Sequence, residues 1–108
     1  MTKRIERASE VIKKELAVIV SREIEAPNTF VTLTRVEVSS DLHYADVYFL
    51  TIPDDASYGI AAELNKNIYS IQQNLNKRLR MRPVPKIRFR IDEQEQEAAK
   101  IDEILKRI

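Results

Sequence analysis

Six apolar residues in the middle of the chain follow one another at steps of four, four, three, four and four positions. They are Ile60, Leu64, Ile68, Ile71, Leu75 and Leu79. This spacing places all six on one face of an α-helix, so it predicts a helix from Ala56 to about Met81. Arg82 and Val84 each precede a proline, which disfavours helical geometry and ends the helix there. A helix with one apolar face must bury that face against another part of the fold.

The segment after this helix changes to strand periodicity. Ile87, Phe89 and Ile91 alternate strictly with basic residues, which predicts a strand over residues 86–91 with one apolar face. Two earlier segments, residues 30–39 and 44–52, are rich in β-branched residues and predict two more strands. A turn at Ser40–Asp41 would join these two into an antiparallel hairpin. The alternation of the first strand slips between Leu33 and Val36, which indicates a bulge or a change of buried face.

Amphipathic helices are predicted at both ends of the chain. The first runs from Arg4 to Ile24, and its apolar stripe comprises Ile5, Ala8, Ile12, Leu16, Ile19 and Val20. A short C-terminal helix is marked by Ala98, Ile101, Leu105 and Ile108. It follows acidic residues that suit a helix N-terminus, namely Glu93, Glu95 and Glu97.

The predicted order of elements is α-β-β-α-β-α, an α+β fold with one layer of helices on a three-stranded mixed sheet. The strand at residues 44–52 carries apolar groups on both faces, so we expect it to be central. The connection through the long helix to the last strand is a crossover, which would make those two strands parallel. The 108 residues are most simply one domain, residues 1–108.

The N-terminus lacks the apolar core of a signal peptide, and no apolar run is long enough to span a bilayer. The chain has no cysteine, which excludes disulfides and thiolate chemistry. We therefore expect a cytoplasmic protein that has no membrane partner.

Positive charge is concentrated in one fourteen-residue stretch, "KRLRMRPVPKIRFR", which we call the basic window. It contains Lys77, Arg78, Arg80, Arg82, Lys86, Arg88 and Arg90, and no acidic residue. These are seven of the 18 basic residues, so the rest of the chain has 11 basic against 17 acidic residues although the net charge is only +1. The asymmetry predicts a polarised molecule.

The basic window has three interpretations. Basic residues at a helix C-terminus complement the helix dipole, and alternating basic residues on a strand protect an exposed edge, but each accounts for only half of the window. Contact with nucleic acid accounts for both halves, because arginine binds phosphate in a bidentate manner. We favour this interpretation. Tyr44, Tyr48, Tyr58 and Tyr69 could stack on bases, although core packing is the better expectation for Tyr48.

Catalytic chemistry is poorly represented. His43 is the only histidine and has no second histidine or cysteine to form a metal site with it, so we interpret it as a turn residue. Gly59 is the only glycine, which excludes glycine-rich phosphate-binding loops. We expect no enzyme, no metal, no cofactor and no small-molecule substrate.

Three strings together resemble the ribosome-binding factor A family. "RIERASEVIKKELAVIVSREI" is similar to the family's opening helix, "VTLTRVEVSSDLHYADVYF" to its V-x-V-S-x-D-L-x-x-A-x-V-Y hairpin, and "LNKRLRMRPVPKIRFRID" to its segment ending in P-x-L-x-F-x-x-D. The resemblance spans nearly the whole chain. It implies a type II KH-like fold and a non-enzymatic assembly factor that binds the precursor small ribosomal subunit and its rRNA. It also implies a role in 5′-end processing and in growth in the cold, without cofactor or catalytic residues.

The sequence departs from this family in the long helix, where the family has an Ala-x-Gly interruption. Here the stretch is "NIYSIQQ", so the helix is either continuous or bent by packing, with Asn67 and Ser70 as weak breakers. The departure moves the predicted RNA contacts to the basic window and to three N-terminal residues. The predicted RNA-binding residues are Lys77, Arg78, Arg80, Arg82, Lys86, Arg88, Arg90, Lys3, Arg4 and Arg7.

Two alternative functions remain open at this point. The first is a protein-interaction module whose basic face binds an acidic protein partner. The second is a stand-alone KH-like domain for other RNAs, which is disfavoured because the chain has no G-x-x-G loop. We expect a monomer in each case.

Overall fold

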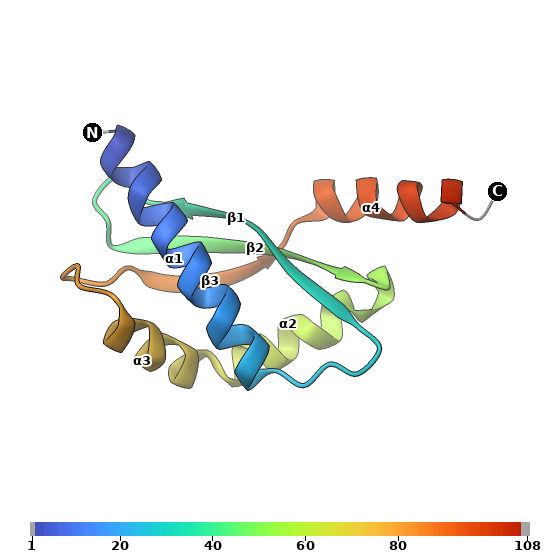
Figure 1. The fold of residues 1–108 in the computed structure, drawn as a ribbon, viewed down its shortest axis with the longest axis horizontal. Helices are drawn as coiled ribbons and strands as arrows, with labels where there is room; N and C mark the ends of the chain where they lie inside the picture. The colour runs from blue at the N-terminus through green and yellow to red at the C-terminus, as the bar shows by residue number, and fades with distance from the viewer. Residues whose placement is uncertain (1, 107–108) are drawn as a thin grey trace.

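The computed structural model describes residues 2–106 and contains the predicted elements in the predicted order (Figure 1). The elements are α1 (Thr2–Glu23), β1 (Phe30–Val38), β2 (Tyr44–Ile52), a 3₁₀ turn (Asp54–Ala56), α2 (Ser57–Lys66), α3 (Ile68–Arg78), β3 (Lys86–Ile91) and α4 (Glu93–Lys106). The long predicted helix is divided into α2 and α3, and it ends at Arg78 rather than Met81.

The three strands form one mixed sheet in the order β1–β2–β3. β1 and β2 are antiparallel, and β3 lies parallel to β2 because the chain crosses over through α2 and α3. The prediction that β2 is central is therefore confirmed. The pairing register shifts between Leu33 and Arg35, so the predicted irregularity is a β-bulge.

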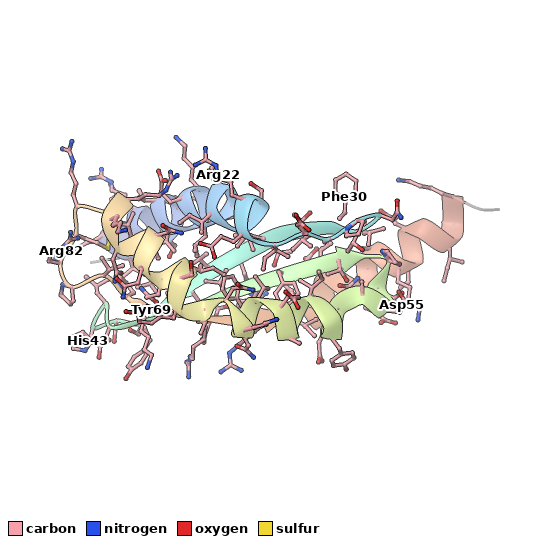
Figure 2. All side chains as sticks on the ribbon, turned by 90° about the horizontal axis from the view of Figure 1, so that it is seen from below. Arg22, Phe30, His43, Asp55, Tyr69 and Arg82 are labelled. Carbon is pink, nitrogen blue, oxygen red and sulfur yellow. The ribbon has the colours of Figure 1, made fainter. Side chains whose placement is uncertain are left out.

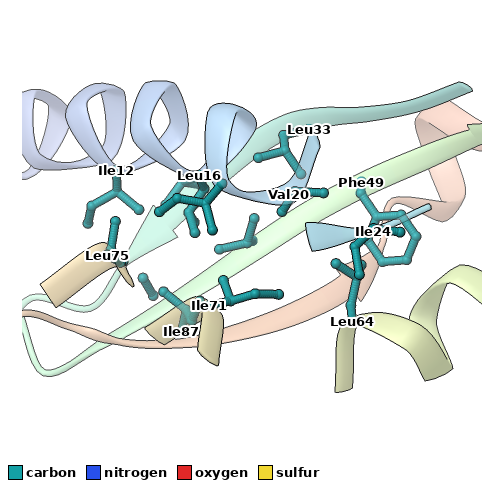
Figure 3. Packing of buried hydrophobic residues seen from close by; sticks show 14 of the residues in the cluster. Ile12, Leu16, Val20, Ile24, Leu33, Phe49, Leu64, Ile71, Leu75 and Ile87 are labelled. Carbon is teal, nitrogen blue, oxygen red and sulfur yellow. The ribbon is translucent and has the colours of Figure 1, made fainter. Parts of the chain in front are cut away.

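α1, α2 and α3 pack on one face of the sheet, and their apolar stripes form one core with it (Figure 3). Fully buried members of this core are Ile12, Leu16, Ala45, Val47, Phe49, Leu64, Ile71 and Leu75. Side chains alternate along each strand, so the neighbours of these sheet residues point to the opposite face. Within residues 2–106 no helix covers that opposite face, which we call the open face.

Asn67 divides the long helix without a glycine. Its φ of −101° and ψ of 11° are outside the helical range but need no left-handed residue. The Asn67 side-chain amide donates to the carbonyl of Glu63 (2.8 Å), which also accepts the backbone N–H of Asn67 (3.1 Å). Asparagine thus interrupts the helix by bonding to its backbone. Leu64 and Ile71, on either side, stay fully buried.

α4 starts at a buried cap and a side-chain clamp. The Asp92 carboxylate accepts the N–H of Glu95 (3.3 Å), and the Asp92 carbonyl accepts the N–H of Gln96 (2.8 Å). The Gln96 amide then accepts the N–H of Thr51 (2.7 Å) and donates to the Thr51 carbonyl (2.6 Å). Ser57 donates a further hydrogen bond to the Gln96 oxygen (3.1 Å). The first turns of α4 are therefore fixed to the end of β2.

Beyond this clamp α4 leaves the helical layer and extends past the end of the sheet (Figure 1). Ile101 is 53% exposed and Leu105 is 61% exposed. The predicted helical layer on one face of the sheet thus consists of α1, α2 and α3, and α4 extends beyond it from its hydrogen-bonded start. Ile108, the last residue of the predicted stripe, lies outside the described residues.

Candidate nucleic-acid interface

The basic window does not form a single surface. Lys77 and Arg78 lie in the last turn of α3, in the helical layer. Lys86, Arg88 and Arg90 lie on the open face, because Ile87 between them is turned into the core and 2% exposed. The two halves of the window therefore face opposite sides of the sheet, and the proline-containing loop at residues 79–85 joins them.

Three arginines of the window have carboxylate partners from other elements. Arg78 pairs with Glu15 of α1 (3.0 Å). Arg88 and Arg90 share Asp46 of β2, at 2.9 Å and 3.4 Å. The window itself contains no acidic residue, but acids that are distant in sequence lie next to it in space.

The open face carries a further arginine that sequence reasoning missed. Arg35 of β1 lies over the Tyr48 ring (3.9 Å to its centroid) and pairs with Glu37 (3.0 Å) and Asp92 (3.4 Å). The contact with Tyr48, and then the carboxylates of Asp92 and Glu37, raise the pKa of Arg35. Tyr48 is half-buried beneath this arginine, so the expectation that it packs in the core is wrong. The cross-strand pairing of Arg35 with Tyr48 is the signal that identifies the site.

A second aromatic contact lies nearer the hairpin turn. Arg88 sits over the Tyr44 ring, 5.7 Å from its centroid, and Tyr44 is 49% exposed. Tyr69 is more exposed still, at 76%, but lies on α3 away from this face. The open face therefore combines arginine with aromatic rings, although its arginines are largely neutralised by carboxylates.

The N-terminal basic residues meet the basic window at one end of the molecule. The start of α1, the β1–β2 turn and the loop at residues 79–85 converge there (Figure 1). They enclose a hollow of about 860 Å³, which we call the terminal hollow. Its cationic lining consists of Lys3, Arg4, Arg7 and Arg82. Figure 2 shows Arg82 at this end, near His43 of the β1–β2 turn.

The cations of this end remain available to a ligand. The Arg82 guanidinium donates to the carbonyls of Leu79 and Met81, both at 2.7 Å, which fixes its position without neutralising it. Among residues 2–106, seven of the ten predicted RNA-binding residues form no ion pair with a carboxylate. These seven are Lys3, Arg4, Arg7, Lys77, Arg80, Arg82 and Lys86.

Among the residues that the structure describes, Asp41 of the β1–β2 turn is the one carboxylate that lines the terminal hollow. Asp41 accepts hydrogen bonds from the Ser39 hydroxyl (2.6 Å) and the His43 N–H (3.0 Å), and these lower the pKa of Asp41. His43 is exposed, with Nδ1 3.3 Å from the Asp41 carboxylate. In residues 2–106 no three His, Cys, Asp or Glu residues lie together as a metal site, and no helix has the length and apolarity to cross a bilayer.

The opposite end of the molecule is acidic. α4 carries Glu93, Glu95 and Glu97 in its first turns, and Asp54 beside it pairs with Lys100 (3.6 Å). The described chain is 49 Å long and 17 Å thick at its extremes, so charge is separated along its long axis. The predicted polarity is thus an arrangement of basic and acidic ends.

Residues 4–105 match the family model described as ribosome-binding factor A. The chain belongs to this family. A ribosome-binding factor A from Trichlorobacter lovleyi is 36% identical over 98% of this chain and 88% of its own length. One from Pelobacter propionicus is 38% identical over 100% of this chain and 90% of its own.

Solved structures of the ribosome-binding factor A family share the fold. The crystal structure of ribosome-binding factor A from Thermus thermophilus has a TM-score of 0.70 and 23% identity, over 81% of this chain and 94% of that one. The solution structure of a putative ribosome-binding factor A from Thermotoga maritima has a TM-score of 0.66 and 32% identity, over 81% and 85%. The KH-like α+β fold implied by the family resemblance is therefore confirmed.

A third neighbour is a homology model of the Thermus thermophilus factor fitted into a cryo-EM map of a 30S–RbfA complex. It has a TM-score of 0.64 and 24% identity, over 76% of this chain and 88% of that one.

Proposed function

We propose that this protein is a non-enzymatic ribosome assembly factor that binds the small ribosomal subunit by contacting its RNA through the basic end. Two kinds of observation support the proposal. Relatives of similar length are named ribosome-binding factors, and one neighbouring structure was fitted into a 30S complex. The observation that carries it is the cluster of Lys3, Arg4, Arg7 and Arg82 around the terminal hollow, where no ion pair occupies them within the described residues.

Cations that lack protein partners attract phosphates and release counterions from an RNA backbone when they bind. The paired arginines of the open face contribute less, because a phosphate must compete with Asp46 for them. On this proposal the basic end meets the subunit and acidic α4 points away from it. The role in maturation and 5′-end processing of small-subunit rRNA belongs to the same proposal. A monomer suffices, since one chain supplies the whole cluster.

The test is co-sedimentation with purified small subunits at several salt concentrations. We expect the wild-type protein to co-migrate with the subunits, and the R4E/R7E variant to be lost from them. The matched control is K14E/R22E, which removes the same charge from exposed positions farther along α1 and should still co-migrate. Equal binding of R4E/R7E and wild type across the salt series contradicts the proposal.

Nuclease treatment distinguishes RNA from protein as the ligand of the basic end. On the proposed function, capture of the subunit by the tagged protein is lost when its RNA is digested. Capture of an acidic protein that survives the digestion would instead favour a protein-interaction module.

A further inference from the structure

The terminal hollow has an apolar lining as well as a cationic one. Val11 of α1, Leu42 of the β1–β2 turn, and Met81 and Pro83 of the following loop all line it. Val11 is 46% exposed, although it lies one turn from residues that are buried in the core. Exposed apolar side chains contribute nothing to the binding of phosphates, because phosphates are recognised by charge and hydrogen bonds.

The volume of the hollow suits part of a nucleic-acid strand. At about 860 Å³ it lies within the range of ordinary ligand pockets. It is formed by three segments, and both α1 and the loop at residues 79–85 contribute apolar as well as cationic side chains to its lining. Leu42 has a φ of 63°, in the left-handed region that leucine rarely adopts, and the hydrogen bonds of Asp41 hold this turn in place.

The electrostatics of the hollow favour an anion. In the described part of the chain, four cationic side chains line it against one carboxylate, that of Asp41, which already accepts two hydrogen bonds. The N-terminal end of α1, with no acidic residue in its first turn, also faces this end of the molecule. Its helix dipole adds to the attraction for negative charge.

We propose, building on the proposed function, that the terminal hollow seats an unpaired nucleotide of single-stranded RNA. The base packs on the apolar lining, and the adjoining phosphates lie against Arg4, Arg7 and Arg82. In duplex RNA the bases are stacked inside the helix and cannot reach such a lining, whereas an unpaired base can be splayed out onto a protein surface. The hollow lies at the opposite end of α3 from the Asn67 break, so the two are separate features.

The experiment measures binding of a labelled, unstructured RNA oligonucleotide and of the same sequence as a duplex. V11S removes apolar surface from an exposed position of the lining. V18S is its matched control, since Val18 is on the same helix, is 37% exposed and does not line the hollow. We expect V11S to bind the single strand roughly fivefold more weakly than V18S, as befits the loss of apolar contact area. The dependence of affinity on salt should be unchanged.

A second lining variant and a charge variant complete the set. M81S should behave like V11S, provided its circular dichroism and unfolding match the wild type. R7Q should instead reduce the salt slope by about 0.7, the value of one phosphate contact on a single strand. Adenosine monophosphate should compete only weakly, because it offers one phosphate group.

Three outcomes overturn the inference. These are equal binding of V11S, M81S and V18S, equal binding of duplex and single strand, or a loss in V11S that comes entirely from a changed salt slope. The proposed function is judged separately, by the sedimentation of R4E/R7E. If that variant is lost from subunits while V11S and M81S bind normally, the basic end binds phosphates alone. If the wild-type protein does not co-sediment with subunits while V11S still weakens oligonucleotide binding, nucleotide binding in the terminal hollow is supported and the proposed function is contradicted.

Discussion

The two ends of the molecule use polar residues in opposite ways. At the acidic end, Gln96 and Asp92 form hydrogen bonds with backbone and hydroxyl groups in partly buried positions. At the basic end, Lys3, Arg4 and Arg7 stand exposed around a hollow, with no carboxylate partner among the described residues. The polar groups of the acidic end are thus satisfied within the fold, while the cations of the basic end are those that the proposed function assigns to RNA.

The arginines of the open face are intermediate between the paired polar groups of the acidic end and the unpaired cations of the basic end. These arginines are exposed, as a ligand requires, but Arg88 and Arg90 already share the carboxylate of Asp46. We therefore expect stability to depend most on the acidic end and RNA affinity to depend most on the basic end.

The largest effect on stability is expected for Gln96→Leu. It leaves the N–H and carbonyl of fully buried Thr51 and the hydroxyl of Ser57 without their amide partner. The Ser57 hydroxyl keeps its contacts with Asp54 and with the Thr51 hydroxyl. Each of the two backbone groups of Thr51 costs about 1–3 kcal/mol when unsatisfied, so we expect a loss of about 2–6 kcal/mol in urea unfolding. RNA affinity of the folded variant should stay within about twofold of wild type. Gln94→Leu, at an exposed position of the same helix, is the control, and an equal loss in both variants would refute the role of the clamp.

The next largest effect is a difference in RNA affinity between variants of unpaired and of paired arginines. R4Q/R7Q removes two unpaired cations, and at 0.1 M salt each lost single-strand contact weakens binding roughly fivefold, so we expect about 25-fold in total. R88Q/R90Q removes the same charge from residues that Asp46 already neutralises, and should weaken binding less than about threefold. Fluorescence anisotropy over a salt series measures both. Equal losses would show that ion pairing on the open face does not limit its RNA contact.

A variant of Arg78 tests whether every residue of the basic window contributes to RNA binding. Because Arg78 pairs with Glu15 across α1 and α3 and is partly exposed, the R78Q variant should lose about 0.5 kcal/mol of stability. Its RNA affinity should change less than that of R7Q. A double-mutant cycle with E15Q isolates the pair, and a coupling free energy near zero would mean that Arg78 is free for RNA as the sequence suggests.

Spacing along the chain was enough to predict most of the fold. The apolar residues of each strand and helix recur at the period of that element, so order, parallel pairing and the bulge after Leu33 followed from local patterns. The direction of α4 did not follow, because it depends on the hydrogen bonds of Gln96 to Thr51, which is 45 residues away. The sequence does not decide whether the helix is divided at Asn67, since a side chain that bonds to its own helix cannot be told from any other polar residue in the sequence.

Only part of the candidate site could be predicted from the sequence. Composition located the cations, and the strand period correctly put Arg88 on the face opposite Ile87. Composition could not show which cations are neutralised, because Glu15 and Asp46 reach the basic window only through tertiary packing. Nor could it show that Arg82 shares a hollow with Arg7, since that depends on the path of the loop.

The smallest effect concerns Asp41, the acid of the basic end. Its pKa is lowered in the folded protein, first by the Ser39 hydroxyl and then by the His43 N–H. A lowered pKa means that the carboxylate stabilises the fold above the ordinary aspartate value of about 3.9, and that this contribution is lost as pH falls through the folded pKa. The advantage of wild type over D41N in thermal unfolding should therefore be present at neutral pH and vanish under acid conditions.

The same D41N variant should bind RNA slightly more tightly, by about twofold, because it removes a carboxylate from a hollow lined by four cations. Asparagine retains an oxygen that can accept from Ser39 and from His43, so the turn should persist. D46N is the counterpart on the open face, where loss of the carboxylate frees Arg88 and Arg90. If D46N raises RNA affinity and D41N does not, the open face rather than the terminal hollow is the main RNA surface, and the contrast drawn between the two ends fails.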